Sequence, residues 1–148
     1  MKFLSSLIAA ALVACATLAV ASDGSVGRVK TLEGSASVLR GQVSVPAAVN
    51  ERIFQGDTLR TGPDGSLGVI LKDDTSLSLG PNSEVAVDQF LFAPAEGKLS
   101  LVTRMVRGTA VYVSGIIAKL SPQTVRFETP NASIGIRGTR FLVKVDED

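Results

Sequence analysis

The chain has 148 residues, of which 15 are basic and 14 acidic, and it contains one cysteine but neither histidine nor tryptophan. These counts exclude Ser-His-Asp and Cys-His catalysis and leave none of the usual ligand sets for zinc, iron or copper. A net charge of only +1 argues against nucleic acid as a partner. We therefore expect a binding protein that is not an enzyme and has neither a cofactor nor a metal site.

Residues 1–21 have the pattern of a secretory signal peptide. Lys2 precedes an apolar run, Phe3 to Val20, and the segment ends in Ala19-Val20-Ala21, with small residues where signal peptidase requires them. We expect cleavage after Ala21 and a periplasmic or secreted product, residues 22–148. That length suits a single domain with a real core.

Two alternatives to this cleavage are a membrane anchor and a lipidated cysteine. The apolar run is at the short end of the roughly 20 residues that a spanning helix needs. Leu12-Val13-Ala14-Cys15 also resembles a lipobox, in which Cys15 would carry the lipid. The chain stays apolar after Cys15, whereas a lipoprotein usually turns polar there, so cleavage after Ala21 is the favoured prediction. The longest later apolar segment, 111–120, is interrupted by polar residues, and we expect no transmembrane segment after cleavage.

After the signal, apolar and polar residues alternate with a period of two, which is typical of half-buried strands. The expected strands are residues 26–32, 36–40, 67–71, 76–80, 84–88, 98–102, 109–113, 125–128 and 141–145. Turn signals rich in Gly, Pro, Asp and Asn separate them at intervals of about 8 to 12 residues. The best helical candidate, 116–120, is very short. The pattern predicts an all-β single domain of many short strands.

Acidic and basic residues are unevenly distributed. Residues 22–97 carry six basic and ten acidic side chains, and residues 98–148 carry eight basic and four acidic ones. A basic patch can attract anionic glycans or an acidic protein surface, although the alternation of strand faces also explains the pattern. The adjacent pair Asp73-Asp74 is the main acid–base option left. In a strand the two side chains would point to opposite faces, and in a turn both would be solvated; we expect them to stabilise a turn.

Three segments resemble the FecR domain family. The first is GRVKTLEGSASVLRG, from Gly27 to Gly41. The second is GDTLRTG, from Gly56 to Gly62, followed by Asp64-Gly65 and by LGPNS, from Leu79 to Ser83. The third is TPNASIGIRGTRF, from Thr129 to Phe141. The resemblance covers essentially all of residues 22–148.

The resemblance implies an extracytoplasmic all-β fold, a twisted β-solenoid-like or sandwich-like wrap. The named members of the family are transmembrane anti-sigma regulators whose periplasmic part receives a signal from an outer-membrane transporter. In this sequence we expect neither a cytoplasmic sigma-binding region nor a transmembrane helix beyond the signal. Of the functions of these family members, we therefore expect this chain to share only that of a sensing or adaptor-type binding module.

Ten residues of the second and third segments are the candidate structural or interaction residues: Gly56, Asp57, Arg60, Thr61, Thr129, Pro130, Gly135, Arg137, Gly138 and Thr139. We expect Asp57 to accept backbone N–H groups in a turn, and Arg60 and Thr61 to tie neighbouring strands together. Arg137 is expected either to bind a carboxylate, such as Asp57 or Glu128, or to contact a partner.

Two functions fit these patterns. The first is a non-catalytic, extracytoplasmic protein-interaction or signal-sensing module that binds an envelope protein, using the edge of a sheet. The alternative is a structural envelope protein that binds cell wall or glycan. Sugar-binding faces usually use aromatic platforms, and Tyr112 is the only tyrosine in a chain without tryptophan. The protein-binding function is therefore favoured.

Overall fold

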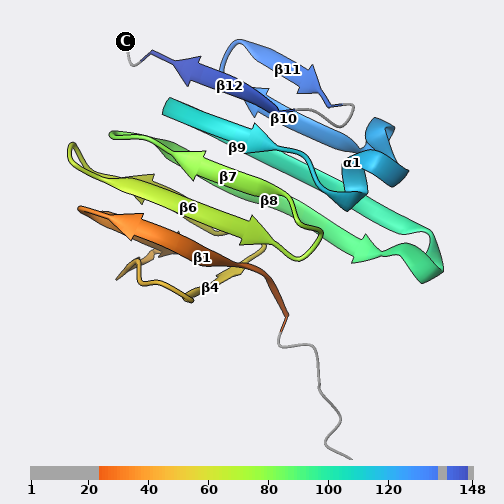
Figure 1. Cartoon of the computed structure of the whole chain (residues 1–148), viewed down its shortest axis with the longest axis horizontal. Coiled ribbons are helices and arrows are strands. Elements are labelled where there is room, and N and C mark those ends of the chain that lie inside the picture. Colours follow the sequence, from red (N-terminus) through yellow and green to blue (C-terminus); the bar gives the residue numbers. More distant parts are fainter. Residues whose placement is uncertain (1–23, 137–139, 147–148) are drawn as a thin grey trace, which may run out of the picture.

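The computed structural model describes residues 24–136 and 140–146, and within them it contains twelve strands, one short α-helix and two 3-10 turns. The strands are β1 (Ser25–Glu33), β2 (Ala36–Arg40), β3 (Val43–Pro46), β4 (Arg52–Phe54), β5 (Thr58–Thr61), β6 (Ser66–Leu71), β7 (Ser76–Leu79), β8 (Glu84–Ala93), β9 (Lys98–Val113), β10 (Val125–Thr129), β11 (Ala132–Gly135) and β12 (Arg140–Val145). The predicted all-β class is confirmed (Figure 1).

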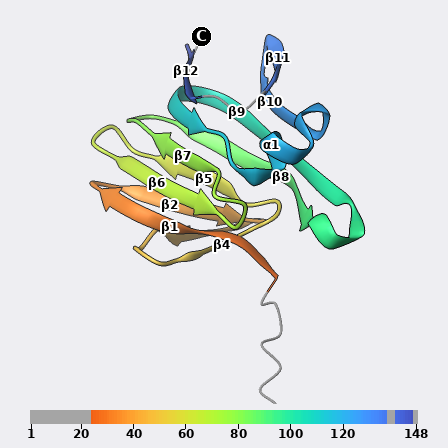
Figure 2. The same ribbon diagram turned by 45° about the vertical axis from the view of Figure 1, so that its right-hand side comes forward.

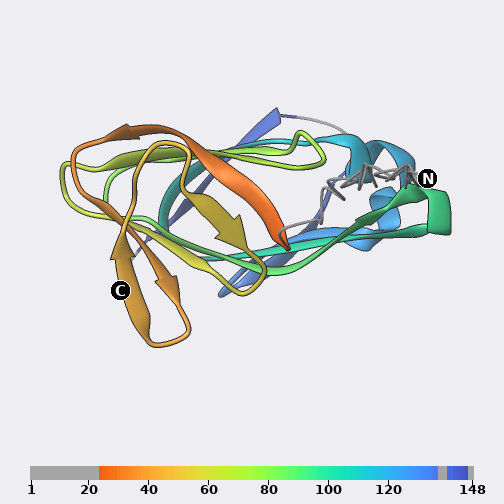
Figure 3. The ribbon, with the colours of Figure 1, turned by 90° about the horizontal axis from the view of Figure 1, so that it is seen from below.

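The strands form one curled sheet that folds into two layers (Figure 3). Layer A has the strand order β4-β1-β6-β7-β9-β12, and layer B has the order β3-β2-β5-β8-β9-β10-β11. Every pair is antiparallel except β9 with β10. The arrangement is therefore sandwich-like, and its antiparallel pairing distinguishes it from a coil of parallel rungs.

β9 belongs to both layers. Its first ten residues, 98–107, pair with β8, and its last six, 108–113, pair with β12. The sequence predicted two strands here, 98–102 and 109–113, because the alternation is interrupted between them. The structure instead has one strand of 16 residues that bends at Gly108, whose φ is +95°. A glycine at the bend lets the strand change layers without breaking.

Four crossings between the layers lie together and form what we call the corner stack. Its segments are residues 34–35, 62–65, 80–83 and 108–109. Backbone hydrogen bonds join each corner to the next: Gly62 N donates to Ser35 O (2.9 Å), Asn82 N to Gly62 O (3.1 Å) and Gly80 N to Thr109 O (3.0 Å). The turns after β1, β5 and β7 thus continue the hydrogen bonding of the strands.

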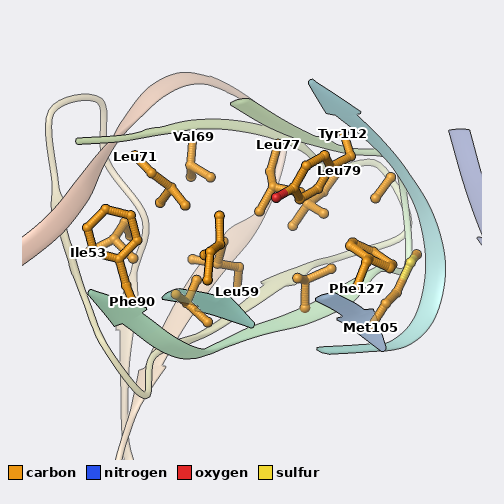
Figure 4. Packing of buried hydrophobic residues seen from close by; sticks show 14 of the residues in the cluster. Ile53, Leu59, Val69, Leu71, Leu77, Leu79, Phe90, Met105, Tyr112 and Phe127 are labelled. Atoms are coloured by element: carbon orange, nitrogen blue, oxygen red, sulfur yellow. The ribbon is translucent and has the colours of Figure 1, made fainter. Parts of the chain in front are cut away.

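The core fills the space between the layers, because each strand directs alternate side chains inward (Figure 4). One aromatic cluster of the core lies at the β9–β10–β12 side. The Tyr112 ring stacks on Phe141 with centroids 5.0 Å apart, and Phe127 meets both rings edge-on. Burying a side chain of this size stabilises the fold by about 1.5–3 kcal/mol.

The short helix α1 (Ile116–Leu120) follows β9 and inserts Ile117 into the core. The turns η1 (Pro94–Glu96) and η2 (Pro122–Thr124) complete the connections. No helix among residues 24–136 and 140–146 is long and apolar enough to cross a membrane.

Candidate functional site

Asp57 lies in the turn between β4 and β5, and its side chain is only 1% exposed. Its carboxylate accepts two hydrogen bonds from Arg40, from Nε at 3.0 Å and from Nη2 at 2.9 Å, and a third from the Phe54 backbone N–H at 2.8 Å. Paired donation by a guanidinium is a strong, directional form of hydrogen bond. Because of the bond to Asp57, the pKa of Arg40 is raised above its ordinary value.

This ion pair joins the two layers. Arg40 is on β2 of layer B, while its Nη2 also donates to Arg52 O on β4 of layer A, at 3.1 Å. The guanidinium stacks over the Phe54 ring, 4.5 Å from the centroid. Asp57 therefore fixes the side of the sandwich where β3 and β4 end the two layers. Asp57, one of the two carboxylates considered as a partner of Arg137, is bound by Arg40.

Gly56 precedes Asp57 and adopts a φ of +89°. Its N–H donates to Val87 O at 2.7 Å, and Val87 N–H donates to Asp57 O at 3.0 Å. A side chain at this glycine would meet no atom within 4 Å, so the requirement here is for the left-handed backbone and not for space.

Arg60 and Thr61 point to opposite faces of β5. Arg60 is exposed and forms an ion pair with Glu84 on β8. Thr61 is buried, and its hydroxyl donates to Gly80 O at 2.6 Å and accepts Ser83 N–H at 2.9 Å. Thr61 thus binds β5 to the turn between β7 and β8.

Ser83 extends this connection to β9. Its hydroxyl accepts the Thr109 N–H and donates to Thr109 O, both at 3.0 Å. The backbones approach so closely here that a Cβ atom on Gly108 would lie 2.4 Å from Ser83 Cα. The sequence indicated that Ser83 lies in a turn, but nothing local to Gly108 or Thr109 indicated their contact with it.

The third segment of the family resemblance, which we call the third motif, lies away from Asp57, on β10 to β12. Thr129 ends β10, Pro130 begins the turn to β11, and Gly135 ends β11. In layer B, β8 and β9 separate β5 from β10, so the second and third motifs do not form one site. Arg137, Gly138 and Thr139 lie outside the described residues.

The third motif borders a feature that we call the open edge, formed by β11 and β12 (Figure 2). Within the described residues, β11 pairs only with β10, and β12 pairs only with β9. A groove of about 470 Å³ is lined by residues of both strands, among them Ile134, Val143, Lys144 and Val145. Both layers therefore end in an unpaired strand on the same side of the molecule.

Asp73 corrects one expectation, because it is fully buried and not solvated. Its carboxylate accepts the Thr75 hydroxyl at 2.8 Å, the Thr75 N–H at 3.1 Å and the Ile117 N–H at 3.2 Å, and so holds α1 against the turn between β6 and β7. Burial raises the pKa of Tyr112 above its usual range, and the nearby Asp73 carboxylate adds to the rise. These three donors satisfy the carboxylate and explain its burial.

Among residues 24–136 and 140–146, no three His, Cys, Asp or Glu side chains are placed to hold a metal ion. The polar groups described above bind one another and the backbone, and such bonding stabilises the fold.

The comparisons with known proteins place the chain in a family. A family model described as "FecR protein" matches residues 57–148, more than half of the chain. No curated protein and no solved structure matches it. The match begins at Asp57 and includes β5 to β12, and therefore the corners at 62–65, 80–83 and 108–109 and the open edge. The chain belongs to the FecR family, a family of signal-sensing and regulatory modules.

Proposed function

We propose that this chain acts outside the cytoplasm as a non-catalytic sensing module that binds a protein of the cell envelope through its open edge. Support comes from the regulatory character of the family and from the signal-like pattern of residues 1–21. The partner adds a strand to β11 or β12.

The observation that carries this proposal is that, among the described residues, β11 and β12 each have one edge without a neighbouring strand. Edge strands present a row of backbone N–H and C=O groups that a second chain can bind. Many natural proteins cover such edges, whereas here two of them lie on either side of one groove. Half-buried Ile134 and Val145 offer apolar contacts, and Lys144 and Asp146 form an ion pair beside them, with 3.7 Å between Nζ and Oδ1. Backbone bonding would supply affinity and these side chains would supply selectivity.

Site-specific crosslinking tests this proposal. A photoreactive residue is placed at Ser133 on β11 or at Lys144 on β12, and, as the matched control, at Ser78 on the outer face of layer A; all three positions are exposed. In the native cells, we expect Ser133 and Lys144 to crosslink to the same envelope protein and Ser78 not to do so. Absence of a crosslink at the open edge, or equal crosslinking at Ser78, would overturn the proposal.

The location has its own test. The product purified from the cell envelope is expected to begin at Ser22, as measured by intact mass and N-terminal sequencing. A product that begins at a lipid-modified Cys15 would establish the lipoprotein form, and a product that retains residues 1–21 in the cytoplasm would contradict export.

Glycan binding is a second candidate because of a hollow on layer A. The hollow has a volume of about 300 Å³, and Ser66, Ser78 and Thr109 contribute hydroxyl groups to its lining. None of the described residues that line it is aromatic, so they offer no stacking surface of the kind that sugars usually meet. Salt-dependent pelleting of the protein with insoluble cell wall, lost in a Ser78→Lys variant, would favour this function over protein binding.

A further inference from the structure

The two strands of the open edge differ in length and in the side chains that they present. β11 has four residues, and three of them are the small residues Ala132, Ser133 and Gly135. β12 has six residues, and their exposure alternates along the strand. A longer edge offers more backbone hydrogen bonds to an added strand, and larger side chains can select its sequence. β12 is therefore the better defined receiving edge of the two.

The outward face of β12 carries a cation, a leucine and a second cation at alternate positions. Arg140, Leu142 and Lys144 are all exposed. Leu142 is 69% exposed, more than any other large hydrophobic side chain among the described residues. On β9, Val113 lies opposite Arg140 and Val111 lies opposite Leu142. One exposed apolar residue is ordinary on a protein surface, but Leu142 continues an apolar strip of β9 that stops at the edge of the layer.

The two cations of this face differ in their surroundings. Lys144 pairs with Asp146, with 3.7 Å between Nζ and Oδ1, and the two side chains are 70% and 82% exposed. Exposed ion pairs of this kind contribute little to stability, so a carboxylate of a partner can replace Asp146 at little cost. Asp146 follows the last residue of β12 and lies at the far end of the strand from Arg140. The row therefore keeps a formal charge of +1.

The inward face of β12 is apolar and incompletely covered. Phe141 and Val145 are half-buried, and Val143 is 9% exposed. Beside them lies the groove of about 470 Å³, whose lining includes Val143, Val145 and, on β11, Ile134. Neighbouring strands of a sheet lie about 4.8 Å apart, so a strand added to β12 would run along this groove. Its inward side chains would cover the apolar groups that the fold leaves half-buried.

From these two faces we propose that β12 binds an extended segment of the partner whose outward residues are an acid, an apolar residue and a second acid. This inference rests on the proposed function of the open edge and specifies the partner. The acids lie beside Arg140 and Lys144, and the apolar residue lies beside Leu142. The residues between them are apolar and close the groove. The outward pattern is the same in both directions, so it fits a parallel or an antiparallel strand.

The side chains decide this selectivity, because the backbone bonds of an added strand are the same for every sequence. Opposite charges on neighbouring strands stabilise a sheet, and like charges directly opposite each other destabilise it. An acidic segment would therefore gain at both cations, whereas a basic segment would lose at both.

Titration of the full chain with labelled synthetic peptides, followed by fluorescence anisotropy, tests the proposal. The acidic probe is the capped hexapeptide Glu-Val-Leu-Val-Glu-Val. The basic probe has Lys in place of both Glu, and the polar probe has Ser in place of Leu. We expect the acidic probe to bind about tenfold or more tightly than the basic probe, with a preference that shrinks as salt is added. It should also bind about fivefold more tightly than the polar probe, since less apolar surface is buried by serine.

A double variant, Arg140→Gln with Lys144→Gln, assigns the charge preference to β12. It is expected to bind the acidic and basic probes with affinities within about twofold of each other. Lys30→Gln, which removes an exposed lysine from β1 of the same layer, is the matched control and should keep the wild-type preference. The readout is a ratio of two affinities for one protein, so a general loss of stability in a variant does not imitate the expected result.

The outcomes separate this inference from the proposed function. Equal binding of the acidic probe and either other probe, or a charge preference that persists in the double variant, overturns the inferred pattern and leaves strand addition at the open edge intact. Crosslinks from Ser133 and Lys144 to one envelope protein, without binding of any probe, would show that the partner binds the edge in another way and would also overturn it. Absence of both probe binding and crosslinks would overturn the inference and the proposed function together.

Discussion

The corner stack and the open edge use strand ends in opposite ways. At the corner stack, backbone and hydroxyl groups of Thr61, Ser83 and Thr109 bind one another, and Gly108 has no room for a side chain. At the open edge, β11 is largely exposed, and a side chain at Gly135 would meet no atom of the described residues within 4 Å. The difference teaches that the two specific family segments have different roles: the second helps to close the fold at the corner stack, whereas the third borders a strand with an accessible edge.

The largest effect is expected for Gly108→Ala. The new Cβ would lie 2.4 Å from a backbone atom of Ser83, at a φ of +95°, so we expect a loss of about 3 kcal/mol or more in the free energy of unfolding. Gly41→Ala is the control, because Gly41 has a φ of +62° and open surroundings; its expected cost is about 1 kcal/mol. Urea denaturation measures both. Equal losses would show that backbone strain, and not close approach, explains Gly108.

The next effect is that of Asp57→Asn. The variant keeps an acceptor for Phe54 N–H but loses the charge that Arg40 binds, and we expect a loss of about 2 kcal/mol, since Arg40 is partly exposed and regains water. Glu84→Gln, which removes the exposed ion pair with Arg60, should cost under about 1 kcal/mol. Urea denaturation of both variants measures the difference, and a larger loss in Glu84→Gln would contradict the role given to Asp57.

Gly135→Ala tests the open edge in the same way. The added methyl group meets open space and the backbone does not have a positive φ, so the free energy of unfolding should change by less than about 0.5 kcal/mol. Thermal and urea denaturation would detect a larger change in the free energy of unfolding. A loss in the free energy of unfolding close to that of Gly108→Ala would mean that the open edge is packed in solution, and it would contradict the contrast between the open edge and the corner stack.

The smallest effect concerns Asp64 in the corner stack. The Ser35 hydroxyl donates to its carboxylate at 2.8 Å and is the main reason that the pKa of Asp64 is below its ordinary value. A lowered pKa in the folded state stabilises the fold above the ordinary pKa of aspartate, and this contribution is lost as the pH falls through the lowered value. Ser35→Ala should raise the pKa of Asp64, as measured by NMR titration. An unchanged pKa would contradict the role of this hydrogen bond.

Much of the fold could be predicted from local patterns. The alternation in residues 67–71 and 76–80 corresponds to β6 and β7, and the short helical candidate 116–120 is α1. Four strands, β3, β4, β5 and β11, were not among the expected strands, because each has only three or four residues and β3 is also mostly exposed. Long β9 was divided in two because the sequence does not show that one strand serves both layers.

The candidate site was less predictable because its contacts join distant residues. Turn chemistry indicated the roles of Gly56 and Asp57, but Arg40 lies 17 positions away and nothing in the sequence connects it to Asp57. In the same way, Arg28 and Arg52 become neighbours only through the register of β1 and β4. Periodicity places a residue on a face of a strand, whereas the partner across the sheet depends on the pairing of the whole chain.

The strand β9 also has a consequence for how the protein unfolds. It pairs with β8 and β10 in layer B and with β7 and β12 in layer A. β9 is a strand of both layers, so unfolding that displaces β9 from one layer also removes a strand from the other layer. The two layers are therefore expected to lose their structure in a single cooperative step, with no intermediate in which one layer persists alone.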